Sequence, residues 1–558
     1  MSGGRTRGAA REASDRAAPR DAPGRRRRRC PLLGLVLVVL LGTAILVCTA
    51  LAGRTRLPAP ALLLGSGVLM GFVPALHEVQ LPPELMLLIF LPLLLYWESL
   101  STSLREIRKN LTGIAVMSTL LVIATAAAVA VLAHLWGLPW GAAWVLGAAV
   151  APTDATAVST VARLLPRRDI TVLRAEGLVN DGTALVVYGV AVGVTVGEES
   201  LSAPHVGWLF LLSYCGGVAA GAVTALFWAA VRRRIENALL QNVAILLIPF
   251  TAFLLAEGVE ASGVLAVVVA GLIMSQAGPT IGRPLSRRQT EASWSLAVFL
   301  VNGSLFVLVG LEVHTAVRGL ASLALAQALA LVALVSVLVL AVRGAFVLGP
   351  ALLVRLLPRA WRPTGGPGLP SRLVNAMAGF RGAVSLAVAL SVPQTTSSGA
   401  AFPERDLIVF TTTGVILVTL VVQGLLLPPL ISRAGLPDDS DVERERRFAQ
   451  RTAIEEALEA LPGTASALDT DPAVASRLEE EYREHLETLR EDPDAARTDR
   501  IRNREEQYTA LRLALLARKR ATVIRLRDER RIDDVVLRRM QSAMDTEEVR
   551  LTHREQFE

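Results

Sequence analysis

Apolar residues fill most of the chain up to position 435, in runs that short polar segments separate. An α-helix needs about 20 apolar residues to cross the hydrocarbon core of a bilayer. Reading the chain with a window of that length predicts about thirteen membrane-spanning helices. They cover residues 32–52, 60–76, 84–100, 111–136, 140–163, 171–196, 206–231, 239–257, 261–277, 291–312, 319–349, 372–393 and 405–432.

The two ends of the chain have a different pattern. Residues 1–30 are mainly Arg, Ala, Gly and Pro, which predicts a disordered basic N-terminus. Residues 436–558 are rich in Glu, Asp, Arg and Ala, which predicts a soluble helical tail with helices near 442–460, 472–491 and 499–552. Residues 31–435 between them form the predicted transmembrane domain.

Composition agrees with this division, and charge orients the helices. Of the 558 residues 52% are hydrophobic and 19% are charged, so most of the chain must lie in lipid. The net charge is +7, and no aromatic residues alternate with the basic ones, which argues against nucleic acid as a partner. We expect the protein to lie in the cell membrane. By the positive-inside rule, its arginine-rich loops and its tail face the cytoplasm. These loops are residues 105–109, 166–168, 232–234, 283–288 and 355–372.

The topology of the first helix stays open. An odd number of spans with a cytoplasmic tail would put the N-terminus outside the cell. The five arginines at residues 25–29 favour the opposite side. A secretory signal is an alternative, since a basic segment precedes an apolar one.

Two carboxylates interrupt the apolar runs, Asp154 in the fifth predicted helix and Asp181 in the sixth. A charged side chain at the bilayer centre costs about 2.5–3.5 kcal/mol on insertion scales, so such residues normally serve ion or proton movement. Asp154 follows Pro152 and Thr153. Proline removes a backbone hydrogen bond and frees carbonyl oxygens, which suit a small alkali cation together with a carboxylate. The alternative is a simple proline kink with a hydrogen-bonded Asp154.

Glu176 and Asn180 accompany Asp181 in the sixth helix, and three polar side chains there need partners. Arg343 in the eleventh helix and Arg381 in the twelfth are available. We expect Glu176 to pair with one arginine, which leaves Asp181 free to bind ions; a salt bridge to Asp181 itself is the alternative.

The twelfth predicted helix contains Arg381 followed by Gly382 and Ser385, which indicates a second interrupted helix that meets the first one near Asp154. Crossed discontinuous helices at the bilayer midplane are the ion sites of inverted-repeat transporters. The third helix adds Glu98 towards its end.

Together these segments resemble the first monovalent cation:proton antiporter family, which includes the NhaP-type bacterial exchangers and the animal sodium/proton exchangers. The resemblance covers roughly residues 32–435. The segments that carry it are Leu91-Pro92 to Glu98, Leu104 to Asn110, Thr153-Asp154, Glu176 to Asp181, Arg343, and Arg381-Gly-Ala-Val-Ser-Leu386.

The resemblance implies an all-α protomer of thirteen helices in two inverted six-helix repeats, usually a homodimer, in which one bundle carries the ion and moves against the other. It implies a transporter of Na⁺ and H⁺ that is no enzyme and needs no cofactor. Asn180 before Asp181 is similar to the electroneutral branch of the family.

Carried over by motif position, Asp181 would be the shared cation and proton site. Asp154 and the Thr153 backbone would complete it, and Glu98 would assist. Glu176 would pair with Arg343, and Arg381 would stabilise the crossed helices.

Gly177 departs from the family pattern, which usually has Ser at this position, one turn before the Asp. The change removes one oxygen from the face that carries Asp181, so K⁺/H⁺ exchange is a rival to Na⁺/H⁺ exchange. A channel or a transport-inactive sensor on the same scaffold is a weaker alternative. An intramembrane aspartyl protease also uses two aspartates, but its usual Gly-x-Gly-Asp motif does not precede Asp154 or Asp181.

Overall fold

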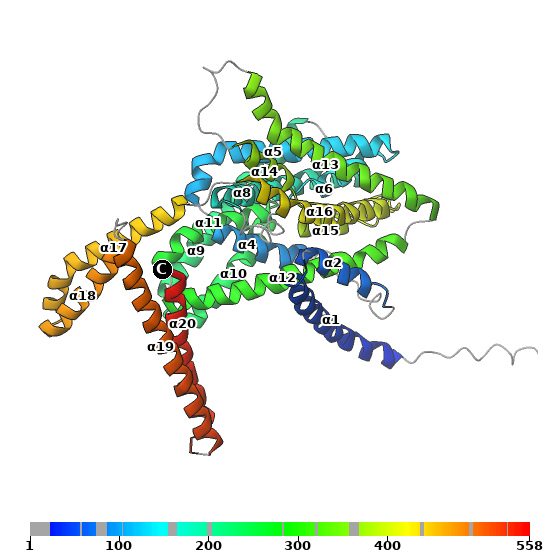
Figure 1. Cartoon of the computed structure of the whole chain (residues 1–558). Coiled ribbons are helices and arrows are strands. Elements are labelled where there is room, and N and C mark those ends of the chain that lie inside the picture. The colour runs from blue at the N-terminus through cyan, green and yellow to red at the C-terminus, as the bar shows by residue number, and fades with distance from the viewer. Residues whose placement is uncertain are drawn as a thin grey trace, which may run out of the picture. The chain divides into compact units, whose positions relative to one another are not determined.

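The computed structural model shows an α-helical protein (Figure 1). The chain divides into two units, Met1–Pro437 and Asp438–Glu558, and each is described by itself. The structure describes residues 23–55, 58–73, 86–102, 104–154, 165–197, 203–281, 284–318, 322–356, 368–435, 440–489, 495–529, 531–532 and 534–557.

The first unit contains the apolar helices. They are α1 (Pro23–Ala52), α2 (Ala59–Met70), the π-helical turn η2 (Met86–Phe90) that continues into α4 (Leu91–Ser101), α5 (Leu104–Leu135), α6 (Trp140–Val150), α8 (Arg167–Val196), α9 (Ala203–Arg234), α10 (Ala238–Glu257), α11 (Gly263–Ile281), α12 (Pro284–Arg318), α13 (Ser322–Leu356), α14 (Leu369–Met377), α15 (Ala383–Leu390) and α16 (Arg405–Ala434).

Among the described residues, eight helices are long and apolar enough to cross a membrane, and four shorter apolar helices accompany them. The predicted helical membrane fold is therefore confirmed, whereas the count of thirteen spans stays a prediction. Helix α1 begins at Pro23 and includes the arginine cluster, so residues 23–30 are helical where the composition predicted disorder. Residues 1–22 lie outside the described part of the chain.

One predicted helix ends near its centre, and another separates into two. Helix α6 ends at Val150 and residues 151–154 are non-helical, so the prolyl segment stops the helix instead of kinking it. Pro152 has no N–H and disfavours helical geometry at the residue before it. The predicted helix 372–393 likewise separates into α14 and α15, with residues 378–382 non-helical between them.

Helix packing divides the first unit into two groups. One, which we call the site group, consists of α5, α6, α8 and α13 to α16. The other, the scaffold group, consists of α1, α2, α4 and α9 to α12. Packing is more extensive within each group than between them. Between the groups, α12 meets α16 and α15, α2 meets α16, and α11 meets α8.

Glycine and alanine allow the closest helix contacts, as is usual in membranes, where small residues let backbones approach. A Cβ at Gly67 of α2 would overlap the carbonyl of Val307 in α12, and one at Gly310 of α12 would overlap the carbonyl of Leu64 in α2. In the same way Gly221 of α9 lies against the backbone of Ala266 in α11.

The second unit consists of α17 (Ser440–Ala467), α18 (Pro472–Leu489), α19 (Ala495–Asp528) and α20 (Asp534–Phe557). The single helix predicted over 499–552 was wrong, because the chain turns between α19 and α20. No Gly or Pro marks this turn in the sequence. Apolar packing between the two helices holds it, through Leu516, Val523, Leu537 and Met544.

The glycine contact between α2 and α12 yields a testable prediction. Gly67→Ala pushes a methyl group into the α12 backbone, and overpacking of this kind costs about 1–3 kcal/mol. We expect a lower thermal unfolding midpoint for the detergent-purified protein. Gly65→Ala is the matched control on the same helix, because a Cβ there meets nothing within 4 Å. Equal midpoints for the two variants would contradict the packing described.

Candidate functional site

Asp181 lies in the middle of α8, close to the two helix breaks. Its side chain is only 6% exposed. Among the described residues, its Oδ1 is buried and has no hydrogen-bond partner. A buried polar atom without a partner is costly and normally has a functional reason. The ion pairs between described residues do not include Asp181, and Arg343 binds Glu176 instead.

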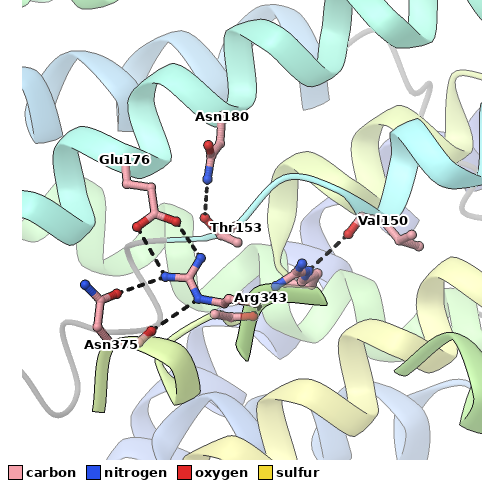
Figure 2. Close-up of polar contacts among 8 residues, drawn as sticks. Val150, Thr153, Glu176, Asn180, Arg343 and Asn375 are labelled. Carbon is pink, nitrogen blue, oxygen red and sulfur yellow. Dashed lines mark hydrogen bonds and ion pairs between the residues drawn. The ribbon is translucent and has the colours of Figure 1, made fainter. Parts of the chain in front are cut away.

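Asn180 connects α8 to the first break (Figure 2). Its fully buried amide lies 2.8 Å from Thr153 Oγ1. With the amide oriented so that its oxygen accepts from the Thr153 hydroxyl, its nitrogen donates to the carbonyls of Ser118 (3.2 Å) and Glu176 (3.3 Å). Asn180 therefore fixes the position of Thr153, and with it the start of the segment that carries Asp154.

Asp154 lies at the point where the two breaks cross. Its backbone N–H donates to the carbonyl of Phe380 at 2.7 Å. A Cβ at Gly382 would overlap the Asp154 carboxylate, so only glycine allows the two segments this close approach. The two interrupted helices predicted from the sequence thus meet through backbone and side-chain contacts.

Glu176 and Arg343 form a buried ion pair one turn before Asn180 (Figure 2). The guanidinium of Arg343 binds both carboxylate oxygens, Nη1 to Oε1 and Nη2 to Oε2, the latter at 3.3 Å. Asn375 of α14 accepts two more bonds from the same guanidinium, at its main-chain oxygen and at Oδ1, both 3.2 Å. Arg343 is 1% exposed, so these bonds replace its hydration and join α8, α13 and α14.

Arg381 holds the second break against the end of α6. Its Nε donates to the carbonyl of Val150 at 3.0 Å, and its Nη1 donates to the carbonyl of Gly379. Val150 is the last residue of α6. A cation at a helix C-terminus satisfies free carbonyls and interacts favourably with the helix dipole.

Glu98 approaches this site from α4, in the scaffold group. The carboxylates of Glu98, Asp154 and Asp181 are near enough for their negative charges to repel one another. The described residues hold no cluster of three His, Cys, Asp or Glu that could jointly ligate a metal. A cation bound here would therefore need hydroxyl, amide and carbonyl oxygens as well as carboxylate.

Sequence reasoning missed several polar residues of the site. Asn375 is one, although a polar residue in a membrane helix signals a partner. Ser118 of α5 is another: it is 1% exposed, and its hydroxyl has no partner in the described structure. Ser385 of α15, which the sequence did indicate, is also 1% exposed with a hydroxyl that has no partner there. In the segment Leu104 to Asn110, which carries part of the resemblance, the side chains of residues 105–110 lie outside the described residues.

Comparison with known proteins identifies relatives of the whole membrane unit. Residues 41–433 match the family model described as the transmembrane sodium/hydrogen exchanger. An uncharacterised Na⁺/H⁺ exchanger of Mycobacterium tuberculosis is 44% identical over 523 residues, 93% of this chain and 96% of the relative. A sodium, potassium, lithium and rubidium/H⁺ antiporter of Bacillus pumilus is 28% identical and aligns with 82% of this chain and 70% of its own.

A solved structure has the same fold. The sodium proton antiporter MjNhaP1 of Methanocaldococcus jannaschii superposes with a TM-score of 0.55 and 17% sequence identity. The superposition covers 72% of this chain and all of the neighbour.

The ion pair gives a second prediction. Glu176→Gln leaves the buried Arg343 charge without its carboxylate, and breaking a buried pair in this way costs about 3–5 kcal/mol. We expect a large loss of thermal stability in detergent. Glu479→Gln is the matched control, since it removes an exposed i,i+4 pair with Arg483 in the tail, worth at most about 0.5 kcal/mol. Similar losses for both variants would rule out a special role for the buried pair.

Proposed function

The chain belongs to the sodium/hydrogen exchanger family, and on this premise we propose that it exchanges Na⁺ or Li⁺ for H⁺ with Asp181 as the shared site. The family and the relatives make it a multi-pass membrane protein and a cation/proton antiporter rather than an enzyme. The choice of cation, the site and the mechanism are the proposal.

The observation that carries the proposal is the free oxygen of Asp181. Glu176 and the two arginines of the crossing have partners that account for their charge: Glu176 binds Arg343, and Arg381 binds the end of α6. Asp181 is buried beside them with an unused oxygen. A buried carboxylate with this geometry needs either a proton or a cation to neutralise it.

Competition at one carboxylate produces exchange. A cation and a proton exclude one another at Asp181, and each makes the site neutral enough to move through the membrane interior. Asp154 and Thr153 would add oxygens from the non-helical segment, positioned by Asn180. Glu98 would assist from α4 through water. With one cation exchanged for one proton, the cycle is electroneutral.

The helix groups supply the movement. We propose that the site group moves as a body against the scaffold group, which would alternately open Asp181 to the two sides of the membrane. Within the site group, the Glu176–Arg343 pair and the bonds of Arg381 would hold the crossing rigid during this movement.

The orientation proposed next rests on the positions of the arginines, and the homodimer rests on the family resemblance. We propose that the protein lies in the cell membrane as a homodimer, with the arginine-rich loops and the tail in the cytoplasm.

A second candidate function is K⁺/H⁺ exchange. Gly177 is buried on α8, one turn before Asp181, and supplies no side-chain oxygen. A site with fewer oxygen ligands loses more affinity for the smaller Na⁺ than for K⁺. The Bacillus pumilus relative is named for potassium as well as sodium, lithium and rubidium.

A third prediction tests the site. In proteoliposomes with an imposed pH gradient, Na⁺ addition should collapse the gradient in the wild type and fail to do so in Asp181→Asn, because the amide binds neither H⁺ nor Na⁺ as the carboxylate does. A pH-sensitive dye records the change, with K⁺ and Li⁺ tested in parallel. Asp406→Asn is the matched control, since this carboxylate is 65% exposed.

The results of this assay distinguish the alternatives for the cation, the function and the site. A response to K⁺ alone would favour the potassium exchanger. A wild type that responds to no cation between about pH 6 and 9 would overturn the antiporter and favour the sensor or channel alternative. Activity retained in Asp181→Asn would overturn the assigned site.

A fourth prediction concerns cation selectivity. Gly177→Ser adds a hydroxyl one turn before Asp181, while Gly177→Ala adds the same Cβ without the oxygen and is the control. We expect the serine variant to have a KM for Na⁺ about fivefold lower than the alanine variant, as an added ligand worth about 1 kcal/mol would give. Identical Na⁺ and K⁺ constants in the two variants would exclude this position from the site.

A further inference from the structure

The hydroxyl of Tyr214 lies over the turn of α8 that follows Asp181. Tyr214 belongs to α9, and its Oη is 2.7 Å from Thr183 Oγ1, two residues after Asp181. A Cβ at Gly182, the residue between them, would lie 3.9 Å from the same oxygen. Tyr214 also hydrogen-bonds with Thr119 of α5. One tyrosine hydroxyl therefore binds α8, the helix that carries Asn180 and Asp181, and α5 beside it.

These hydrogen bonds cross from one helix group to the other. Tyr214 stands on the scaffold group, because α9 packs along α10 and α11. Helix α9 packs closely here. A Cβ at Gly221 would overlap the backbone of Ala266 in α11, and a Cβ at Gly216 or Gly217 would overlap Ala261 or Ser262, which directly precede α11. Thr183 and Thr119 belong to the site group, where α5 and α8 pack against each other.

The acceptor side of this contact is buried and specific. Thr183 is fully buried, and its hydroxyl also donates to the carbonyl of Val179 in its own helix. When that hydroxyl donates to Val179, the Tyr214 hydroxyl is the donor to Thr183. A second hydrogen bond between the groups runs from Arg174 Nη1 to Ser101 Oγ, but it is 3.5 Å long and exposed, so it holds the groups together less firmly.

We propose that the Tyr214 hydroxyl is a latch that stabilises the present arrangement of the site group on the scaffold group. The inference rests on the proposed function, in which these groups move relative to one another during transport. Movement of α8 and α5 along α9 separates Thr183 and Thr119 from the hydroxyl. The latch thus sets the ratio of the two states between which the carrier alternates, without touching the cation.

A change in that ratio alters the KM for Na⁺ differently on the two faces of the membrane. The apparent affinity for a ligand falls in proportion to the population of the state that binds it. Loss of the latch depopulates the present state, so the KM for Na⁺ rises on the face to which this state opens. The KM on the other face falls. A defect in folding or in the site itself cannot move the two constants in opposite directions.

The test uses Tyr214→Phe, which keeps the ring and removes only the hydroxyl. Na⁺/H⁺ exchange is measured with Na⁺ as the probe in right-side-out and in everted membrane vesicles. We expect the ratio of the two KM values to change about fivefold, which corresponds to one net hydrogen bond of about 1 kcal/mol. Thr183→Val removes the partner hydroxyl and should change the ratio in the same direction.

Tyr188→Phe is the matched control. Tyr188 is also on α8, and its hydroxyl accepts from Ser391 Oγ at 3.0 Å. Ser391 directly follows α15, so this hydrogen bond lies within the site group and does not break when the groups move. We expect Tyr188→Phe to leave the KM ratio unchanged.

The outcomes separate the latch from the proposed function. If the wild type exchanges Na⁺ but Tyr214→Phe leaves the ratio unchanged, or alters both KM values equally, the latch is wrong and the exchanger stands. The same conclusion follows if Tyr188→Phe shifts the ratio as much as Tyr214→Phe. If the wild type exchanges no cation, the proposed function fails first.

Discussion

Helices that end inside a membrane expose backbone groups that lipid cannot satisfy, and the rest of the site depends on how the protein satisfies them. The segments 151–154 and 378–382 satisfy part of this need by crossing each other: Asp154 donates its N–H to Phe380, and Arg381 donates to the last carbonyl of α6. The crossing in turn requires glycine at position 382, where the Asp154 carboxylate occupies the space of a side chain.

Around this crossing, the two arginines are bound to other groups of the protein, whereas three carboxylates lie near one another. Arg343 is bound to Glu176 and Asn375, and Arg381 is bound to backbone carbonyls. Glu98, Asp154 and Asp181 repel one another when charged. A group of carboxylates with this repulsion favours the binding of protons or small cations, and in an antiporter the two compete. In the proposed exchanger, the Glu176–Arg343 pair would hold the site in position and take no part in this competition.

The sequence alone predicted the fold class and several residues of the candidate site. Hydropathy predicted a helical membrane unit and a separate charged tail, and the polar residues in apolar runs indicated Asp154, Asp181, Glu176 and Arg343 as the residues to follow. These signals are strong because lipid penalises each unpaired polar group. The turn between α19 and α20 left no such signal, because residues 528–534 contain no Gly or Pro and apolar packing decides it.

What only the tertiary structure decided is which groups meet. The residue pattern by itself did not distinguish Arg343 from Arg381 as the partner of Glu176, and only the family resemblance pointed to Arg343. Physically, the choice depends on where α13 and α14 lie beside α8. Asn375 and Tyr214 likewise gain their roles from neighbours more than 30 residues away along the chain. Hydropathy determines which residues must find a partner, because burial in lipid acts on each residue separately. The identity of the partner depends on helix packing, which brings together residues that are distant in the sequence.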